Sequence, residues 1–520
     1  KKRSVAIVSV FLIILSLSMS ACSNNSTSAG RKDNSVVIVM GKTSEPEAGF
    51  DPAYGWGAGE HVHEPLLQST LTVTAADLTI ENDLATEVAV SEDGLLWQVQ
   101  IRDDVFFTDG KALTTEDVAF TYNTVKEKST VNDFTMFDYA EATDETTVLF
   151  HMNRPYAIWP YTMSIVGIVP QHAYDEAYGQ NPIGSGRYQL KQWDKGQQVI
   201  LEANENYYGE APKIEKVTIL FMDEDAAFTA VRSGQADLAY TAASYAAQDV
   251  DGYQLLSCKS VDNRGINLPA ISYDGKKGND VTSDKALRQA INIGLDRDAL
   301  IGHVLGGYGT PAYSVCDKMP WFNDDAVVSY DFGRAVQILE DGGWLPGEDG
   351  IRAKDGLRAE INILYPASDS VRQALAAELK NQLALLGIDA AVEGVGWDVA
   401  YERAQCDVML WGWGAHTPME LYNIYHTTED GYALYSPYAN EAVDAYMDQA
   451  LSSGKLEESY ILWQKAQSEG IIDDTAWVWL VNIDHLYFVR EDLVVAEQKI
   501  HPHGHGWTIV NNVDQWTWAE

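Results

Sequence analysis

The sequence predicts an α/β protein with more than one lobe, and three observations lead to this fold class. The chain has 520 residues, and a domain length of about 150 residues predicts two to four lobes. After Ile183, short apolar strands alternate with helices, which is typical of βαβ units. The same order of strand, helix and strand returns between Ile361 and Trp411.

The N-terminal residues are predicted to be a targeting signal that lies outside the fold. Residues 1–3 are basic, Val5–Met19 is apolar but too short for a comfortable membrane span, and small residues precede Cys22. This order resembles a bacterial lipobox, which implies a signal peptide over residues 1–21 and lipid attachment to the Cys22 thiol. Residues 22–35 would then be a flexible, lipid-anchored tether. The alternative is an ordinary secretory signal with a coincidental cysteine.

Strands are predicted to dominate the first part of the fold. Within Gly94–Asp117, apolar and polar residues alternate as in a half-buried strand, and Asp109 and Gly110 form a turn pair. Thr114 has the position of a helix N-cap ahead of an acidic first turn and an apolar run. The strands predicted in this part are Val37–Met40, Glu64–Thr72, Leu96–Arg102 and Thr147–Met152.

The second part of the chain mixes both kinds of element. Some segments repeat apolar residues at helical spacing, and others are short apolar runs of strand length. The predicted helices are Asp225–Ser233, Lys285–Leu305, Ser370–Leu386, Asn440–Leu451 and Glu457–Ser468. The predicted strands are Val217–Phe221, Asp237–Tyr240, Ile361–Tyr365, Ile388–Val392, Asp407–Trp411, Trp477–Val481 and His485–Val489.

The composition excludes several classes of partner. The formal net charge is −40 at pH 7, which disfavours nucleic acid and anionic lipid surfaces. Apart from Cys22, the sequence contains only Cys258, Cys316 and Cys406. They are odd in number and lack CxxC spacing, so we expect idle thiols, with one bridge as the alternative. The sequence has no GxxxxGK[ST] motif, the phosphate-binding loop of many ATPases.

Five ordered blocks of residues resemble one family. Gly94–Asp117 is similar to a signature segment of bacterial ABC-importer solute-binding proteins of the peptide/nickel type (family 5), with Ile101 for leucine and Thr115 for alanine. The other four blocks are Asn181–Tyr188, Asn204–Pro212, Ala230–Asp237 and Ala286–Leu300. Arg187 stands where the family has proline. The resemblance extends over most of the chain after the tether.

The resemblance implies an α/β, two-lobed periplasmic-binding-protein clamshell of type II, with an extra inserted α+β subdomain. Lobe I would combine residues 36–65, 183–262 and 485–520, and the inserted subdomain would be residues 66–182. Lobe II would be residues 263–484. The two segments that cross between the lobes would act as hinges, and the lobes would close around a solute.

The function implied by the resemblance is transport without catalysis. The chain would be an extracytoplasmic lipoprotein, lipid-anchored or periplasmic, that captures a short peptide or a metal chelate, with the chelate favoured. It would deliver this solute as a monomer to an ABC permease served by separate ATPase subunits. No cofactor is required, although nickel or another transition metal could be part of the solute. The alternatives are a secreted metal-dependent hydrolase, although neither HExxH nor GxSxG occurs, or a binding module not coupled to transport.

The loop Trp411–Pro418 is the leading candidate for solute contact. It follows a predicted strand and is rich in glycine, so backbone can approach a ligand closely. In peptide-binding relatives this loop carries an aspartate for the peptide amino terminus, whereas here His416 falls near that place. Trp411 and Trp413 are predicted to line the pocket, and the alternative is that they only pack.

Four further residues are predicted to contact the solute. Arg102 and Arg187 are candidates for pairing with a carboxylate, because a guanidinium binds this group through two parallel hydrogen bonds. Arg102 has the alternative of a surface position on its strand. Tyr54 and Trp56 precede a segment that borders the cleft in the resembled family and are predicted to line it.

Several histidines are candidates for metal contact. Imidazole suits nickel, copper and zinc, and two residues two apart on a strand share one face. The candidates are His61, His63, His416, His501, His503 and His505. The alternative is that these histidines bind no metal.

Overall fold

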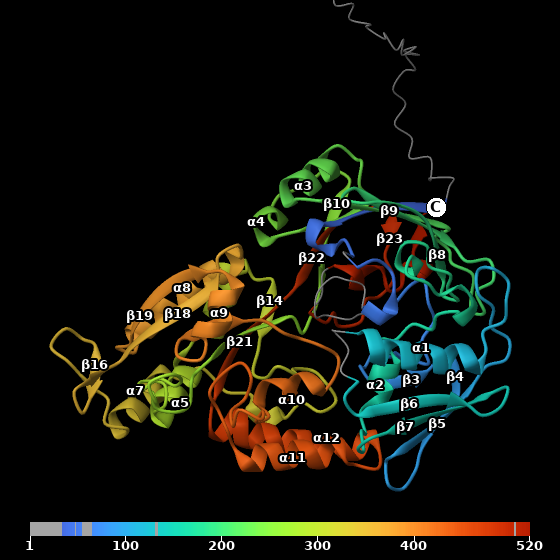
Figure 1. Ribbon diagram of the computed structural model, residues 1–520. Coiled ribbons are helices and arrows are strands. Elements are labelled where there is room, and N and C mark those ends of the chain that lie inside the picture. The colour runs from blue at the N-terminus through green and yellow to red at the C-terminus, as the bar shows by residue number, and fades with distance from the viewer. Residues whose placement is uncertain (1–33, 47, 55–64, 130–133, 504–505, 520) are drawn as a thin grey trace, which may run out of the picture.

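A computed structural model describes the chain over residues 34–46, 48–54, 65–129, 134–503 and 506–519. Three bodies, each built around one sheet, make up the molecule (Figure 1). We call the body around the seven-stranded sheet lobe I, that around the six-stranded sheet lobe II, and that around the four-stranded sheet the inserted subdomain. Within the described ranges, no helix combines the length and apolar character needed to cross a membrane.

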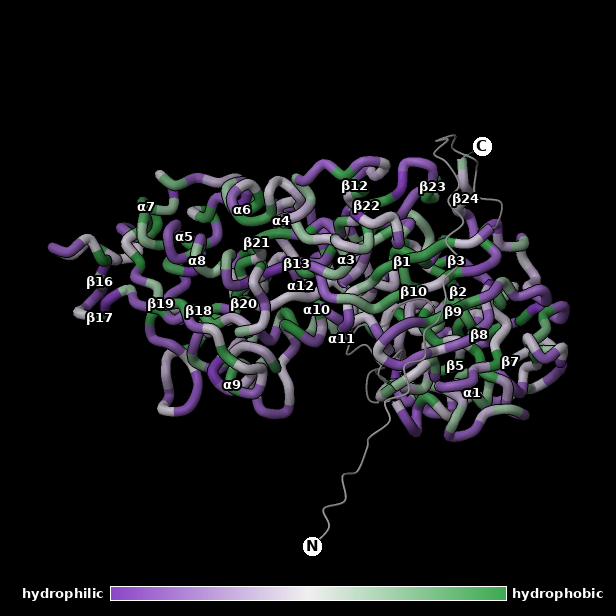
Figure 2. Tube along the Cα trace, turned by 90° about the horizontal axis from the view of Figure 1, so that it is seen from above, coloured by the Kyte–Doolittle hydropathy of each residue, from purple (hydrophilic) through white to green (hydrophobic). Residues whose placement is uncertain are grey.

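Lobe I is a mixed sheet with strand β1 at its centre. Strand β1 pairs in parallel with β10 and β11. Figure 2 shows β10 beside β1, both with apolar segments. The strands in order are β12 (Tyr253–Cys258), β22 (His485–Arg490), β11 (Leu238–Thr241), β1 (Ser35–Gly41), β10 (Lys216–Met222), β9 (Gln198–Ala203) and β8 (Tyr188–Asp194). Helices α3 (Glu224–Arg232) and α4 (Ala243–Ala246) belong to this body.

Lobe II has its own mixed sheet and most of the helices. The strands in order are β14 (Gly309–Pro311), β21 (Trp477–Ile483), β13 (Asn263–Asn267), β20 (Val408–Trp411), β18 (Glu360–Pro366) and β19 (Asp389–Val395). The helices are α5 (Lys285–Gly294), α6 (Arg297–Val304), α7 (Phe332–Asp341), α8 (Ser370–Leu385), α9 (Trp397–Arg403), α10 (Met419–Tyr425), α11 (Glu441–Leu451) and α12 (Leu456–Gln467). A small sheet of β15 (Leu345–Pro346), β16 (Arg352–Lys354) and β17 (Leu357–Arg358) extends from it.

The inserted subdomain is an antiparallel sheet covered by a capped helix. Its strands in order are β4 (Ala85–Val90), β5 (Leu96–Ile101), β7 (Thr147–Met152) and β6 (Phe137–Ala142), and its helices are α1 (Thr115–Lys128) and α2 (Trp159–Met163). Thr114 and Asp117 form a capping box at the start of α1, as predicted. Two strand pairs lie outside the main sheets: β2 (Thr72–Thr74) with β3 (Ile80–Asn82), and β23 (Leu493–Val494) with β24 (Thr517–Trp518).

The chain crosses between the two large sheets twice. Residues 259–262 lead from β12 into β13, and Asp484 separates β21 from β22. The two crossings lie beside each other, because Ile483 donates its backbone N–H to the Asp262 carbonyl at 2.8 Å. Any movement of one lobe against the other must therefore be taken up in these few residues.

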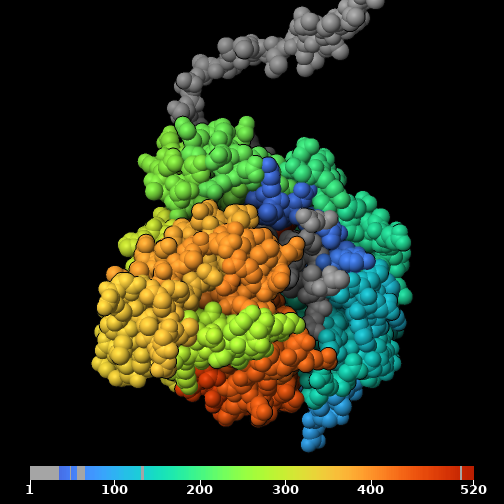
Figure 3. All heavy atoms as spheres, turned by 60° about the vertical axis from the view of Figure 1, so that its left-hand side comes forward, coloured from blue at the N-terminus to red at the C-terminus, as the bar shows by residue number. Residues whose placement is uncertain are grey.

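The inserted subdomain also contacts lobe II. The Ala157 N–H donates to the Leu451 carbonyl at 2.8 Å, and the Tyr161 and Tyr460 hydroxyl oxygens are 3.2 Å apart. The atoms of these two parts adjoin in the space-filling view (Figure 3). The three bodies therefore enclose the region where the crossings and the loop after β20 meet.

The single helix predicted over Lys285–Leu305 is wrong, because the structure has two helices there. Helix α5 ends at Gly294, Leu295 is extended, and Asp296 caps α6 by accepting from the Ala299 N–H at 2.9 Å. The apolar spacing runs through the break, so only the aspartate signals it.

The strand predicted over Glu64–Thr72 is also wrong over its described part. Strand β2 begins only at Thr72, and residues 65–71 form none. Two of their carbonyls instead accept hydrogen bonds from the segment that leads into β8. The Gly186 N–H donates to the Leu67 carbonyl at 3.0 Å, and the Tyr188 N–H donates to the Leu66 carbonyl at 3.3 Å.

The three cysteines of the described chain are free thiols, as expected. Cys258 and Cys316 are buried, and Cys406 is half-buried.

Candidate functional site

The loop Trp411–Pro418 lies where both lobes meet. Its Trp413 carbonyl accepts from the Asn263 N–H at the start of β13, next to the first crossing, and its Gly414 carbonyl accepts from the His503 N–H of the C-terminal tail, both at 2.8 Å. The side chain of Glu420 accepts from the Gly414 N–H at 2.9 Å. The loop is therefore fixed both to lobe II, beside the first crossing, and to the tail.

The two tryptophans of this loop belong to a buried aromatic cluster. Trp411 and Trp413 are only 3% and 6% exposed, and their rings stack at 5.2 Å between centroids. The edge of Trp413 meets Trp477 at 5.3 Å, and Trp477 stacks on Trp479 at 5.4 Å. In this conformation, both predicted pocket residues mainly support the loop.

Helix α9 presents the exposed aromatic surface that sequence reasoning missed. Trp397 and Tyr401 are 44% and 45% exposed, and their rings lie 6.1 and 5.3 Å from the Trp411 ring. Their i, i+4 spacing is the only sequence signal, because it puts both rings on one helix face. We name Trp397 and Tyr401 the α9 aromatic face.

Two buried guanidinium groups lie beside Gly412 of the loop, and one of them also lies against the α9 aromatic face. Arg372 lies 5.9 Å from the Trp397 ring centroid and pairs with Asp369 at 2.5 Å. Arg264 pairs with Asp262 at 2.5 Å. Burial lowers the pKa of Arg372 to about 10, helped by the neighbouring charge of Arg264. The backbone of Gly412 passes so close to both guanidinium groups that a Cβ has no space there.

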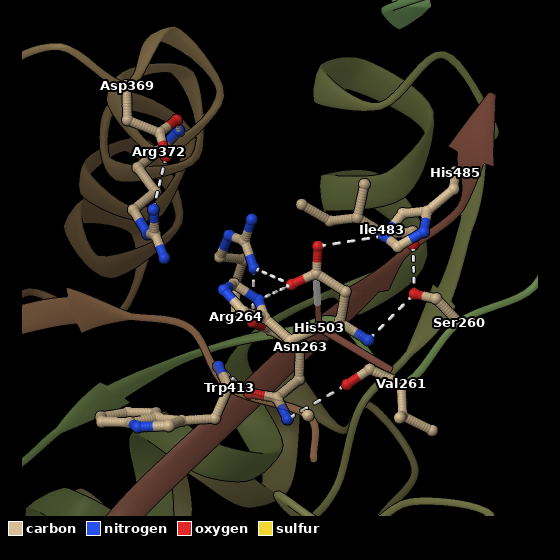
Figure 4. Close-up of polar contacts among 12 residues, drawn as sticks. Ser260, Val261, Asn263, Arg264, Asp369, Arg372, Trp413, Ile483, His485 and His503 are labelled. Atoms are coloured by element: carbon tan, nitrogen blue, oxygen red, sulfur yellow. Dashed lines mark hydrogen bonds and ion pairs between the residues drawn. The ribbon is translucent and has the colours of Figure 1, made fainter. Parts of the chain in front are cut away.

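Asp262 is the centre of a polar cluster at the crossings, and Figure 4 labels its partners Arg264, His485 and His503. Its carboxylate pairs with Arg264, with His503 Nδ1 and, at 3.3 Å, with His485 Nε2. Burial alone would raise the pKa of Asp262, but Arg264 and the two histidines outweigh it and hold this pKa well below its usual range. Burial lowers the pKa of His503, and that of His501 well below its usual value.

His416 is a neutral imidazole beside a small cavity. Burial, helped by the charge of Lys499, lowers its pKa to about 3. Its Nε2 has no hydrogen-bond partner in the described structure, and a hydrogen bond to the Ile500 backbone uses the ring's other nitrogen. The cavity measures about 60 Å³ and is lined by residues of the inserted subdomain, lobe II and the tail: Thr74, Tyr161, Ser164, Ile165, Ala415, His416, Thr417, Lys499, Pro502 and Asn511.

Acidification is expected to destabilise the protein through His416. Its pKa is about 3 when folded and 6.5 otherwise, so the unfolded chain binds the proton first and stability falls below about pH 6.5. At pH 5 the loss from this group is at most about 2 kcal/mol. Urea unfolding at pH 7 and pH 5 measures it. His416→Gln cannot titrate and should lose correspondingly less, and equal losses in both proteins would contradict the assignment.

The two predicted arginines lie away from the loop. Arg102 pairs with Asp104 through Nε at 2.9 Å and through its terminal nitrogen at 2.8 Å, and it covers the Tyr208 ring. Arg187 pairs with Asp514 at 3.2 Å. It borders a separate cavity of about 630 Å³ between the inserted subdomain and the tail.

The remaining predicted residues are divided between described and undescribed parts. Tyr54 is 42% exposed at the end of a described range. His501 and His503 contact His485 and Asp262 respectively. Among the described residues, no group of three or more His, Cys, Asp or Glu side chains is arranged to hold a metal ion. The predictions for Cys22, Trp56, His61, His63 and His505 lie outside the described residues.

Comparison with known proteins places this arrangement in a family. Residues 79–433 match the family model described as bacterial extracellular solute-binding proteins, family 5 Middle. Protein XP55 of Streptomyces lividans is 31% identical over 476 residues, which are 87% of this chain and 85% of that protein. The oligopeptide-binding protein AppA of Bacillus subtilis is 26% identical over 556 aligned positions that span both chains completely.

Solved structures share the fold. NikZ from Campylobacter jejuni, in complex with Ni(L-His), has a TM-score of 0.74 at 23% identity, with 94% of this chain and 100% of that chain covered. AppA from Bacillus subtilis, in complex with a nonapeptide, has a TM-score of 0.70 at 24% identity with the same coverage. The predicted two-lobed α/β fold is therefore confirmed. The chain belongs to the bacterial extracellular solute-binding proteins of family 5.

Proposed function

We propose that the solute is a metal chelate, such as nickel held by free histidine, or a short peptide, and that the chelate fits this site better. Proteins of this family are binding proteins that capture a solute outside the cytoplasm for an ABC-type transporter. The observation that carries the proposal is the neutral His416 at the meeting of the inserted subdomain, lobe II and the tail.

A neutral imidazole is the form that coordinates a transition metal. Burial keeps His416 unprotonated across the physiological range, so metal binding need not displace a proton from it. Its Nε2 makes no hydrogen bond within the described residues, so coordination there would break no such contact. A small movement of the loop would open this nitrogen to a solute.

The scarcity of other ligands favours a chelate over a bare ion. The described residues contain no group of three metal-binding side chains, and a chelate brings most of its own ligands. The α9 aromatic face offers apolar surface to the organic part of such a solute. Arg372, beside the Trp397 ring, places positive charge near this face for a carboxylate.

A short peptide could use the same aromatic face and the same positive charge. Relatives are associated with both solute types. AppA of Bacillus subtilis is named an oligopeptide-binding protein, and NikZ from Campylobacter jejuni was solved in complex with Ni(L-His). The distinction therefore depends on His416, which a peptide does not require.

Titration calorimetry of the purified chain distinguishes the two solutes. We expect heat from nickel with free L-histidine, and little from nickel alone or from dipeptides and tripeptides. His416→Ala should weaken nickel–histidine binding by about 10-fold or more, because it removes a direct ligand. His303→Ala is the matched control, since His303 is an exposed histidine paired only with Glu378. Tight peptide binding without a metal effect would overturn the chelate proposal.

We also propose that the protein is a monomer held at the outer face of the membrane by acyl chains on Cys22, next to its permease and ATPase. The order of charged, apolar and small residues before Cys22 supports this anchor. Mass spectrometry of the membrane-extracted protein tests it. An N-terminus other than an acylated Cys22 would contradict it.

A further inference from the structure

Three separate parts of the chain come together at the Asp262 carboxylate. Asp262 itself ends the first crossing, His485 follows the second crossing, and His503 belongs to the C-terminal tail. Arg264, on the first strand of lobe II, completes the set at 2.5 Å. Figure 4 shows Arg264, His485 and His503 converging between the ribbons of both lobes.

The direction of the hydrogen bonds can be followed into this carboxylate from the tail. Gln498 donates from Nε2 to the Ala496 carbonyl at 3.0 Å, and a carbonyl can only accept. Gln498 Oε1 therefore faces His501 Nε2 at 3.2 Å and must accept from it. The Nδ1 of the neutral His501 is then left as an acceptor.

The next link is His485. Its Nδ1 lies 3.1 Å from His501 Nδ1 and must donate to it, while its Nε2 faces the Asp262 carboxylate at 3.3 Å. His485 thus links the tail to the Asp262 carboxylate through its two ring nitrogens.

The other charged groups at the crossings are already paired. Asp484 accepts from Lys259 Nζ at 2.6 Å and from Ser257 Oγ at 2.8 Å. Ser260 Oγ donates to the Ile483 carbonyl at 2.5 Å and so links the two crossings directly. Asp262 is therefore the carboxylate that joins the crossings to both the tail and lobe II.

We propose that Asp262 is the positioning residue of the hinge. Its carboxylate accepts from groups at the crossings and in the tail, which holds the two lobes at one angle to each other and so limits their opening. Opening by rotation at residues 259–262 and 484 has to move His485 or His503 relative to Asp262. Charge-assisted hydrogen bonds are each worth about 10-fold or more in an equilibrium constant, so losing them should shift the balance toward open forms. This inference rests on the capture of a solute in the proposed function but not on the identity of that solute.

Single-molecule energy transfer on the solute-free protein tests the proposal. Dyes are attached at Ser233→Cys in lobe I and Leu385→Cys in lobe II, both exposed positions, in a chain carrying Cys406→Ala. We expect a narrow distance distribution for the parent protein. Asp262→Asn should lengthen the mean distance, and raise the open fraction about 10-fold or more.

Two further variants make the result decisive. Asp492→Asn removes the same charge from an ion pair with Arg490 within lobe I and should leave the distribution unchanged. His503→Gln breaks only the link to the tail and should widen the distribution less than Asp262→Asn. If Asp262→Asn does not fold, the distance distribution of His503→Gln alone tests the proposal. Distributions identical to the parent would overturn the proposal, and because no solute is added, failure of the chelate proposal would leave this test unaffected.

Discussion

Replacing Gly414 with alanine is expected to destabilise the protein by about 2–5 kcal/mol. Gly414 has φ +143°, a conformation that side chains disfavour, and an added Cβ would lie 2.7 Å from the Val261 carbonyl carbon and closer still to its oxygen. Real Cβ atoms essentially never approach closer than 3.0 Å. Either the loop or the first crossing must move, and the hydrogen bond from His503 to Gly414 would be lost.

Chemical unfolding of Gly414→Ala measures this effect, and Gly431→Ala is its matched control. Gly431 also has positive φ, +82°, but nothing lies within 4 Å of an added Cβ. The control should therefore show only the backbone cost, about 1–2 kcal/mol. Equal losses in the two variants would mean that the loop moves freely away from the crossing, and would contradict the close contact described here.

Much of the fold was predictable because periodicity is a local property of the chain. Strand β7 has the predicted bounds Thr147–Met152, and α11 begins one residue after the predicted Asn440, which is its N-cap. The break between α5 and α6 escaped prediction because the apolar spacing continues through Leu295. A single capping aspartate outweighs that spacing, aided by Gln382, which accepts from the Asp296 N–H at 2.8 Å.

The candidate site was less predictable because its contacts join distant segments. The sequence marks Trp411 and Trp413 as aromatic residues at the end of a strand, but Trp413 packs against Trp477 and Trp479 from another strand. The rings exposed to solvent are those of Trp397 and Tyr401, which no motif distinguishes. The histidine group of the tail was predicted as metal ligands, whereas two of its members contact the crossings.

Substituting Trp413 and Trp397 separately is expected to distinguish a ring that supports the loop from a ring that contacts the solute. Trp413→Ala removes a ring that is 6% exposed and packs on Trp411, Tyr435 and Trp477. The free energy of unfolding should therefore fall by about 3–5 kcal/mol. Trp397→Ala removes a ring that is 44% exposed, so stability should change by less than about 1 kcal/mol. Both values come from urea unfolding followed by far-ultraviolet circular dichroism.

The affinities should follow the opposite order once the proteins are folded. Trp397→Ala removes half of the α9 aromatic face and should weaken nickel–histidine binding by about 10-fold, because a ring that covers a ligand contributes roughly 1–2 kcal/mol. Trp413→Ala, measured where it is still folded, should bind more like the parent, since its ring lies behind Trp411. Val399→Ala on the same helix, with an exposed but non-aromatic side chain, is the control. If Trp397→Ala binds as tightly as the parent, the solute does not contact the α9 aromatic face.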